Sequence, residues 1–313
     1  MNKRKVAIIG TGVVGATVAY TLALKNITAE IFLIDINEEK AEGEMLDILH
    51  GLPFYNESVN IKVGKYRECR NADIVVIATG TLNNQKAKTR LDLAEKDSAI
   101  AKEVTQKVVK AGFKGIFLCV SNPVDIITYV VKKVSNFPAN KVLGTGTMLD
   151  TSRFKYLLGE FFEVSPKSIQ GYVLGEHGDS SFPVWSNCFI SGKQIFDYID
   201  ENKIKLEDLN NIYINTKNAG YIVASKKNAT YYAVSMCTAR IVQAIFQDEN
   251  IVFPVSTYLD GEYDKKDICI GVPAIINRDG ASKVVELKLT RTERVKLENS
   301  VQVIKNVIDK LEI

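Results

Sequence analysis

Histidine is scarce in this chain: only His50 and His177 occur among 313 residues. The five cysteines are odd in number and form no Cys-x-x-Cys pair, so the sequence predicts neither a disulfide framework nor a zinc site. They are Cys69, Cys119, Cys188, Cys237 and Cys269. Several lie in apolar runs, and we therefore expect buried thiols in a reducing, cytoplasmic setting.

Excess charge is also lacking, since 40 Lys and Arg face 37 Asp and Glu for a net charge of +3. That balance is too small to indicate nucleic acid or an anionic membrane as a partner. No apolar stretch approaches the length of a membrane span. The basic start of the chain leads into a strand and a glycine loop, so we expect no signal peptide. The length allows a sizeable core and two domains.

The first half of the chain alternates short apolar runs with helix-like stretches. The predicted strands are residues 5–9, 30–35, 60–63, 73–78, 115–120 and 141–143, and the predicted helices include 16–25, 38–49 and 91–111. Runs such as Ile31-Phe32-Leu33-Ile34 are apolar at consecutive positions, which is typical of parallel strands covered on both faces. The pattern predicts an α/β fold with a doubly wound parallel sheet.

After about Gly146 the pattern becomes mixed. We expect helices at 150–162, 206–247 and 291–311, and strands at 169–174, 184–190, 268–273, 274–277 and 284–289. Asn277-Arg278-Asp279-Gly280 is a hairpin-type turn. The sequence therefore predicts a nucleotide-type domain over 1–145 and a mixed α+β domain over 146–313.

Glycines follow the first predicted strand in the order Gly10-Thr11-Gly12-Val13-Val14-Gly15. This spacing lets a pyrophosphate approach the N-terminus of a helix closely, although glycines also serve ordinary turns. Asp35 ends the next strand, 20 residues beyond Gly15. A carboxylate there accepts a ribose 2′-hydroxyl and repels a 2′-phosphate. The pattern predicts a site for NAD rather than NADP.

His177 lies in Gly175-Glu176-His177-Gly178-Asp179. Imidazole is the side chain best suited to exchanging a proton near neutral pH, although a lone histidine is more often structural. Asp150 and Arg153 lie three residues apart on a predicted helix and share a face. The carboxylate can orient an imidazole and the guanidinium can bind a carboxylate as a fork, but the spacing also suits an ordinary surface pair.

Several further motifs occur in a fixed order along the chain. They are Ser121-Asn122-Pro123-Val124-Asp125, Gly144-Thr145-Gly146-Thr147, Leu149-Asp150-Thr151-Ser152-Arg153-Phe154, Phe182-Pro183-Val184-Trp185-Ser186, Ala229-Thr230-Tyr231-Tyr232, Pro254-Val255-Ser256 and Gly271-Val272-Pro273. Together with the glycine and histidine motifs, they make the chain resemble the NAD-dependent L-lactate and malate dehydrogenases. The resemblance covers nearly the whole chain and implies a Rossmann domain followed by a substrate domain.

The resemblance implies a role for each matching residue. His177 matches the proton donor and acceptor, Asp150 its carboxylate partner, and Arg153 the arginine that grips the substrate carboxylate. Arg90 matches a lid arginine that polarises the substrate carbonyl, and Thr230 a pocket threonine. The residues expected at the cofactor are Gly10, Gly12, Val13, Val14, Gly15, Asp35, Thr79, Gly80 and Asn122, of which Asn122 also faces the substrate. His50 matches no such role.

The predicted lid departs from the family pattern. Counting back from Arg90 places Asn84 at the position that selects the substrate, whereas matching the Gln-Lys pair places Gln85 there. Malate dehydrogenases have an arginine at that position, and both candidates here are neutral. The resemblance therefore implies pyruvate as the 2-oxo acid, with a 2-hydroxyisocaproate-type dehydrogenase as the alternative. A non-catalytic NAD-binding protein is the alternative from a different class.

Regulation and assembly also follow from the resemblance. Many bacterial relatives bind fructose 1,6-bisphosphate through an arginine and a histidine, and Lys155 and Gln170 stand at those places. Lysine keeps the charge but loses the fork, so we expect little effect of this effector. The family implies a homo-oligomer, either a tetramer or a dimer.

Overall fold

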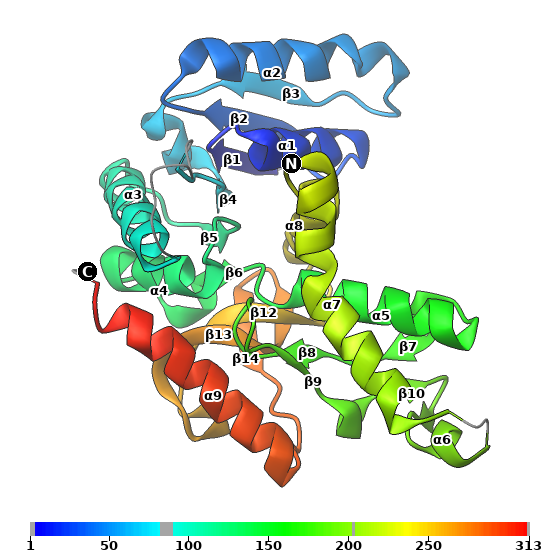
Figure 1. Ribbon diagram of the computed structural model, residues 1–313. Helices are drawn as coiled ribbons and strands as arrows, with labels where there is room; N and C mark the ends of the chain where they lie inside the picture. The colour runs from blue at the N-terminus through cyan, green and yellow to red at the C-terminus, as the bar shows by residue number, and fades with distance from the viewer. Residues whose placement is uncertain (1–3, 82–89, 202–203, 312–313) are drawn as a thin grey trace.

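The computed structural model of the protein describes residues 4–81, 90–201 and 204–311, and of residues 90–93 and 200–201 it describes the backbone alone. A nine-stranded sheet runs through the molecule in the order β14-β13-β12-β6-β5-β4-β1-β2-β3 (Figure 1). Its parallel part contains β1 (Lys5–Ile9), β2 (Glu30–Ile34), β3 (Asn60–Val63), β4 (Ile74–Ile77), β5 (Ile116–Cys119) and β6 (Val142–Gly144). The predicted α/β fold with a doubly wound sheet is confirmed.

Helices cover both faces of the parallel strands. They are α1 (Val13–Leu24), α2 (Glu38–His50), α3 (Arg90–Lys110) and α4 (Val124–Ser135). Val6 and Ile8 of β1 pack into the same core as residues of α1, α2 and the later helix α8 (Tyr232–Gln247). Ala7 and Ile9 point the other way, into a core shared with α3 and α4. Burial of alternate residues on opposite faces explains why these strands are apolar at consecutive positions.

The second half extends the same sheet with antiparallel strands. These are β12 (Ile251–Asp260), β13 (Lys266–Asn277) and β14 (Gly280–Val284), and β12 pairs directly with β6. Two small sheets contain β7 (Ile169–Gln170), β10 (Phe189–Ile190) and β11 (Lys193–Gln194), and β8 (Val173–Leu174) with β9 (Phe182–Pro183). The helices are α5 (Met148–Phe162), α6 (Asp197–Glu201), α7 (Leu206–Lys227), α8 (Tyr232–Gln247) and α9 (Arg291–Ile308). This half is mixed, as expected.

Several predicted boundaries in the second half are wrong. The expected helix over 206–247 is interrupted at Asn228, whose φ of +69° caps α7 in the left-handed region. The expected strand over 184–190 contains a 3-10 turn, Trp185–Asn187, and only Phe189–Ile190 form a strand, β10. The expected strand over 169–174 is split into β7 and β8. The strands expected at 268–273 and 274–277 are one strand, β13, and the last strand is β14 rather than 284–289. The predicted turn does join β13 to β14, where Asn277 pairs with Gly280.

The cysteine side chains lie where their apolar neighbours in the sequence predict. All five thiols are buried and free, which confirms the expectation of buried thiols. No helix in the described ranges is long and apolar enough to cross a membrane.

The tight turn between β1 and α1 generates a stability prediction. A Cβ at Gly15 would lie 1.9 Å from the carbonyl oxygen of Gly10, whereas a Cβ at the exposed Gly43 of α2 would meet nothing within 4 Å. We expect Gly15→Ala to lower the free energy of unfolding by roughly 1–3 kcal/mol. Gly43→Ala should raise it by about 0.5–1 kcal/mol, because alanine favours helix. Urea unfolding of both variants measures this, and equal shifts of one sign would contradict the packing.

Candidate active site

The loop between β1 and α1 leaves the N-terminus of α1 open. Gly10 has a φ of +94°, and a Cβ there would lie 2.6 Å from the carbonyl oxygen of Ala78. Gly12 caps α1 without any side-chain hydrogen bond, and a Cβ there would meet nothing within 4 Å. The first N–H groups of a helix carry partial positive charge and attract anions. The loop therefore fits a pyrophosphate, as the glycine spacing predicts.

Asp35 follows β2 beside this loop. Its Oδ2 accepts hydrogen bonds from the backbone N–H of Thr11 at 2.7 Å and from the Thr11 hydroxyl at 3.0 Å. Its Oδ1 accepts the N–H of Asn37 at 2.9 Å. Burial opposes ionisation, but these bonds outweigh it and hold the pKa of Asp35 below 3.8. A fixed carboxylate at the end of β2 is compatible with a ribose diol and not with a 2′-phosphate.

Three further predicted cofactor residues follow neighbouring parallel strands. Thr79 and Gly80 come after β4, and Asn122 comes after β5 with an exposed side chain. The hydroxyl of Ser121 donates to the carbonyl oxygen of Thr79, which ties the two loops together. The carboxyl ends of parallel strands meet at one edge of a sheet, where open α/β folds bind ligands. The structure thus brings these loops to the edge that carries the glycine loop.

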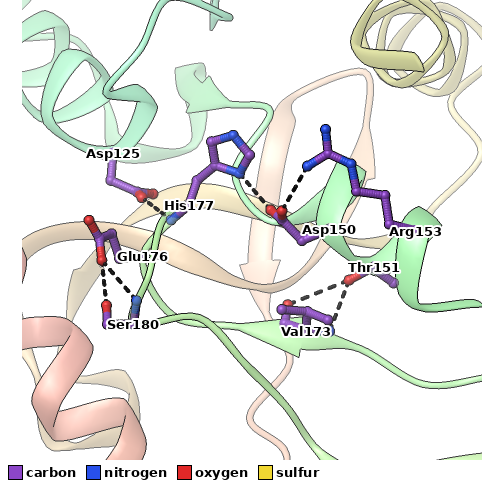
Figure 2. Close-up of polar contacts among 8 residues, drawn as sticks. All are labelled: Asp125, Asp150, Thr151, Arg153, Val173, Glu176, His177 and Ser180. Atoms are coloured by element: carbon purple, nitrogen blue, oxygen red, sulfur yellow. Dashed lines mark hydrogen bonds and ion pairs between the residues drawn. The ribbon is translucent and has the colours of Figure 1, made fainter. Parts of the chain in front are cut away.

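His177 lies in the loop between β8 and β9, facing the first turn of α5 (Figure 2). Its Nδ1 is 2.5 Å from Oδ2 of Asp150, and the two side chains are 21% and 11% exposed. The hydroxyl of Thr151 accepts the N–H of Val173 at 2.9 Å and joins α5 to β8. This bond places the carboxylate next to the imidazole, and the structure brings together the pair that the resemblance implied.

The contact between His177 and Asp150 shifts the pKa of both side chains. Burial lowers the pKa of His177, but the negative charge of Asp150 and its hydrogen bond outweigh burial and raise the pKa above 6.5. Burial likewise opposes ionisation of Asp150, yet the charge of His177 holds its pKa below 3.8. The imidazole is therefore favoured in its charged form at a site that can give a proton away.

Arg153 lies one helical turn beyond Asp150 on α5. Its Nη1 is 3.4 Å from Oδ1 of Asp150, and its side chain is largely buried. Both Nη atoms lie 3.4 Å from the place where a Cβ of Gly220 would stand, so α7 forms the opposite wall. Thr230 is half-buried in the link from α7 to α8. One carboxylate is thus shared between the imidazole of His177 and the guanidinium of Arg153.

The predicted lid is described only at its two ends. Asn84 and Gln85 lie outside the described residues, and Arg90 begins α3 with only its backbone described. Before this segment, the N–H and the hydroxyl of Thr81 both donate to Oδ1 of Asp97 at 2.9 Å. These bonds attach Thr81, at the start of the predicted lid, to α3.

Sequence reasoning assigned no role to Asp125, although it belongs to a quoted motif. Its carboxylate accepts the backbone N–H of His177 at 2.7 Å (Figure 2). The only signal was its position three residues after Asn122, at the start of α4. The other histidine, His50, is exposed at the end of α2.

The two residues expected at the effector site, Lys155 and Gln170, differ in their surroundings. Lys155 is half-buried, and this desolvation lowers its pKa. Its Nζ lies 6.0 Å from the centre of the Tyr172 ring. Gln170 is exposed on β7. Within the described ranges, no three His, Cys, Asp or Glu side chains are grouped to hold a metal ion.

Comparisons with known proteins cover the chain almost completely. A model of the lactate/malate dehydrogenase NAD-binding domain matches residues 4–144, and a model of the lactate/malate dehydrogenase α/β C-terminal domain matches residues 147–312. The chain is 46% identical to an L-lactate dehydrogenase of Geobacillus sp. (strain WCH70), covering 98% of this chain and 96% of that protein. It is 44% identical to an L-lactate dehydrogenase of Lactococcus lactis subsp. cremoris (strain NZ9000), covering 99% of both.

Solved structures agree with the sequence matches. The crystal structure of the minor L-lactate dehydrogenase from Enterococcus mundtii in its ligands-bound form has a TM-score of 0.97 to this chain, with 41% identity and 100% of both chains covered. These matches confirm the resemblance and the two-part architecture. The chain belongs to the lactate/malate dehydrogenase family.

Proposed function

We propose that the protein is an NAD-dependent L-lactate dehydrogenase, which interconverts pyruvate and L-lactate. The observation that carries the proposal is the 2.5 Å contact of His177 with Asp150, with Arg153 on the same carboxylate. A proton donor and a carboxylate-binding arginine thus lie together. The full-length similarity to L-lactate dehydrogenases supports pyruvate over bulkier 2-oxo acids.

The cofactor proposal is NAD(H), and the chain's own residues fit it. The open glycine loop and the ionised Asp35 favour a pyrophosphate and an unmodified ribose. The residues that would hold the cofactor are Gly10, Gly12, Val13, Val14, Gly15, Asp35, Thr79, Gly80 and Asn122. When bound, NADH supplies a hydride for the carbonyl carbon of the substrate.

The protein residues would then supply binding, charge and a proton. Arg153 binds the substrate carboxylate as a two-pronged fork. Protonated His177 gives its proton to the carbonyl oxygen, and Asp150 stabilises the imidazolium beforehand and fixes the ring through Nδ1. We propose that Arg90 stabilises the charge that develops on the oxygen. Thr230 and either Asn84 or Gln85 would surround the substrate side chain.

The division of the chain and its assembly remain proposals. The two family-model ranges support a boundary between 1–145 and 146–313. We propose a cytoplasmic homo-oligomer, a tetramer or a dimer. Exposed apolar side chains such as Leu24 on α1, Phe54 after α2 and Ile222 on α7 support burial against further copies.

Substrate choice tests the proposed function. In a spectrophotometric assay of NADH oxidation, we expect kcat/KM for pyruvate to exceed that for oxaloacetate by roughly 100-fold, because a second carboxylate would be buried unpaired. Asn84 and Gln85 are then replaced by arginine, one at a time. The replacement that raises kcat/KM for oxaloacetate identifies the residue that selects the substrate. An unmodified protein that prefers oxaloacetate would defeat the proposal. A higher kcat/KM for 2-oxoisocaproate than for pyruvate would change the assigned substrate and leave the proposed reaction in place.

Proton donation is tested through the two histidines. His177→Asn should lower kcat by roughly 10²–10⁴-fold and leave NADH affinity nearly unchanged, because the nucleotide loop lies elsewhere. Asp150→Asn should lower kcat by roughly 10³–10⁴-fold, as in other Asp–His pairs. His50→Asn is the matched control and should retain full turnover. Near-normal kcat in His177→Asn would rule out this histidine as the donor.

Cofactor choice is tested at Asp35. The unmodified protein should use NADH with a higher kcat/KM than NADPH, because a carboxylate beside a 2′-phosphate is a like-charge contact. Asp35→Ser should lower the ratio of kcat/KM for NADH to kcat/KM for NADPH. Glu160→Ser removes one negative charge from an exposed position of α5 and should leave the ratio unchanged. Equal kcat/KM for both cofactors before substitution would show that Asp35 does not select.

A further inference from the structure

We infer that Asp125 is a positioning residue for His177: its carboxylate fixes the loop that carries the histidine and places a second negative charge beside the imidazole. The inference rests on the proposed function in one respect, because it takes His177 as the proton donor. Its geometry stands independently of that role.

The contact reaches His177 from the side opposite Asp150. Asp125 lies in the first turn of α4 and is 2% exposed. Its Oδ2 accepts the N–H of His177 at 2.7 Å, across 52 residues of sequence, whereas Asp150 holds the ring at Nδ1 (Figure 2). One carboxylate thus sets the direction of the imidazole and the other sets the place of its backbone.

Other contacts hold the loop near its ends. Gly175 pairs with Gly271 of β13 through two backbone hydrogen bonds of 3.0 Å. The carboxylate of Glu176 accepts the N–H of Ser180 at 3.3 Å and also its hydroxyl. Asp125 adds an anchor at His177 itself. Because α4 begins directly after Asn122 and Pro123, this anchor ties the histidine to the loop expected at the cofactor.

Asp125 is buried among few groups that can stabilise its charge. His177 and Glu176 face it from the loop, Ser256 from β12 and Cys269 from β13. Ser256 is close enough for its hydroxyl to lower the pKa of Asp125, yet its Oγ and Oδ1 of Asp125 make no hydrogen bond of ordinary geometry within the described chain. Burial is the largest influence and raises the pKa of Asp125 to about 6.

This burial opposes stability at the pH of function. The pKa of Asp125 is about 6 in the folded protein against an ordinary 3.8, so folding takes up a proton between these values. Stability therefore falls as the pH rises through this range, and the loss is complete above about pH 6. An asparagine has the same shape, can accept the N–H of His177 and can donate to Ser256. Packing alone thus favours asparagine, and the carboxylate is explained by its charge beside the imidazole.

Two substitutions in the full-length protein separate anchor from charge. Asp125→Asn keeps the anchor and removes the charge, and Asp125→Ala removes both. Glu30→Gln is the control, because Glu30 is a buried carboxylate on β2 that pairs with Lys5 and Lys62. Selective ¹⁵N-histidine labelling and NMR titration measure the pKa of His177 in each free protein, with His50 as internal reference. Thermal unfolding at pH 8 and kcat for pyruvate are measured beside it.

We expect Asp125→Asn to lower the pKa of His177, leave that of His50 unchanged and leave the Tm at pH 8 unchanged or higher. Asp125→Ala should lower kcat by roughly 10²-fold, as displaced catalytic groups do, and by more than Asp125→Asn. Glu30→Gln should lower Tm without moving the pKa of His177.

An unshifted pKa of His177 in Asp125→Asn, or full kcat in Asp125→Ala, would overturn the inference. If Asp125→Ala fails to fold, the Asp125→Asn titration decides alone. Failure of the unmodified protein to reduce pyruvate would defeat the proposed function, while the titration would still decide the role of Asp125.

Discussion

The pairing of β6 with β12 is the contact on which the site depends. Ser256 lies opposite Gly144, where a Cβ would stand 2.3 Å from the hydroxyl oxygen of Thr128. The missing side chain at Gly144 lets α4 pack closely on β6, and the backbone pairing of β6 with β12 joins the parallel strands to the antiparallel ones in one sheet (Figure 1). The loop after β5, the helix after β6 and the bridge at Gly271 are therefore fixed relative to one another. Residues from both halves of the chain meet at that edge.

The second constraint is the charge of the buried side chains, because burial alone would favour the uncharged forms of Asp150 and His177. The charge of His177 lowers the pKa of Asp150, and the charge of Asp150 raises the pKa of His177, so each favours the ionised form of the other against burial. Arg153 shares the carboxylate of Asp150 with His177. Removing one member of such a buried pair leaves the other uncompensated, which costs more than the pair contributes to stability. The cluster is thus sensitive to the loss of any one of its members.

Sequence patterns predicted the parallel strands because both of their faces are buried, which leaves apolar runs. The sequence patterns did not predict β12, because Pro254 and several polar residues interrupt its apolar pattern. The strand tolerates this proline because β6 pairs with it only at Ser256 and Thr257. The pairing of His177 with Asp150 came from the family resemblance, since 27 residues separate them. The contact between Asp125 and His177 was not predicted, because Asp125 binds the backbone N–H of His177 and not its side chain. The contact joins residues 52 positions apart, and the backbone N–H that it uses gives no side-chain signal in the sequence.

The central claim is that His177 exchanges the proton, and one comparison tests it most directly. The pH dependence of kcat/KM for pyruvate reports a pKa of the free enzyme, and NMR of the two histidines reports that of His177 independently. We predict that the two values coincide and that both fall together in Asp150→Asn. A kinetic pKa that stays fixed while the pKa of His177 moves would contradict the account.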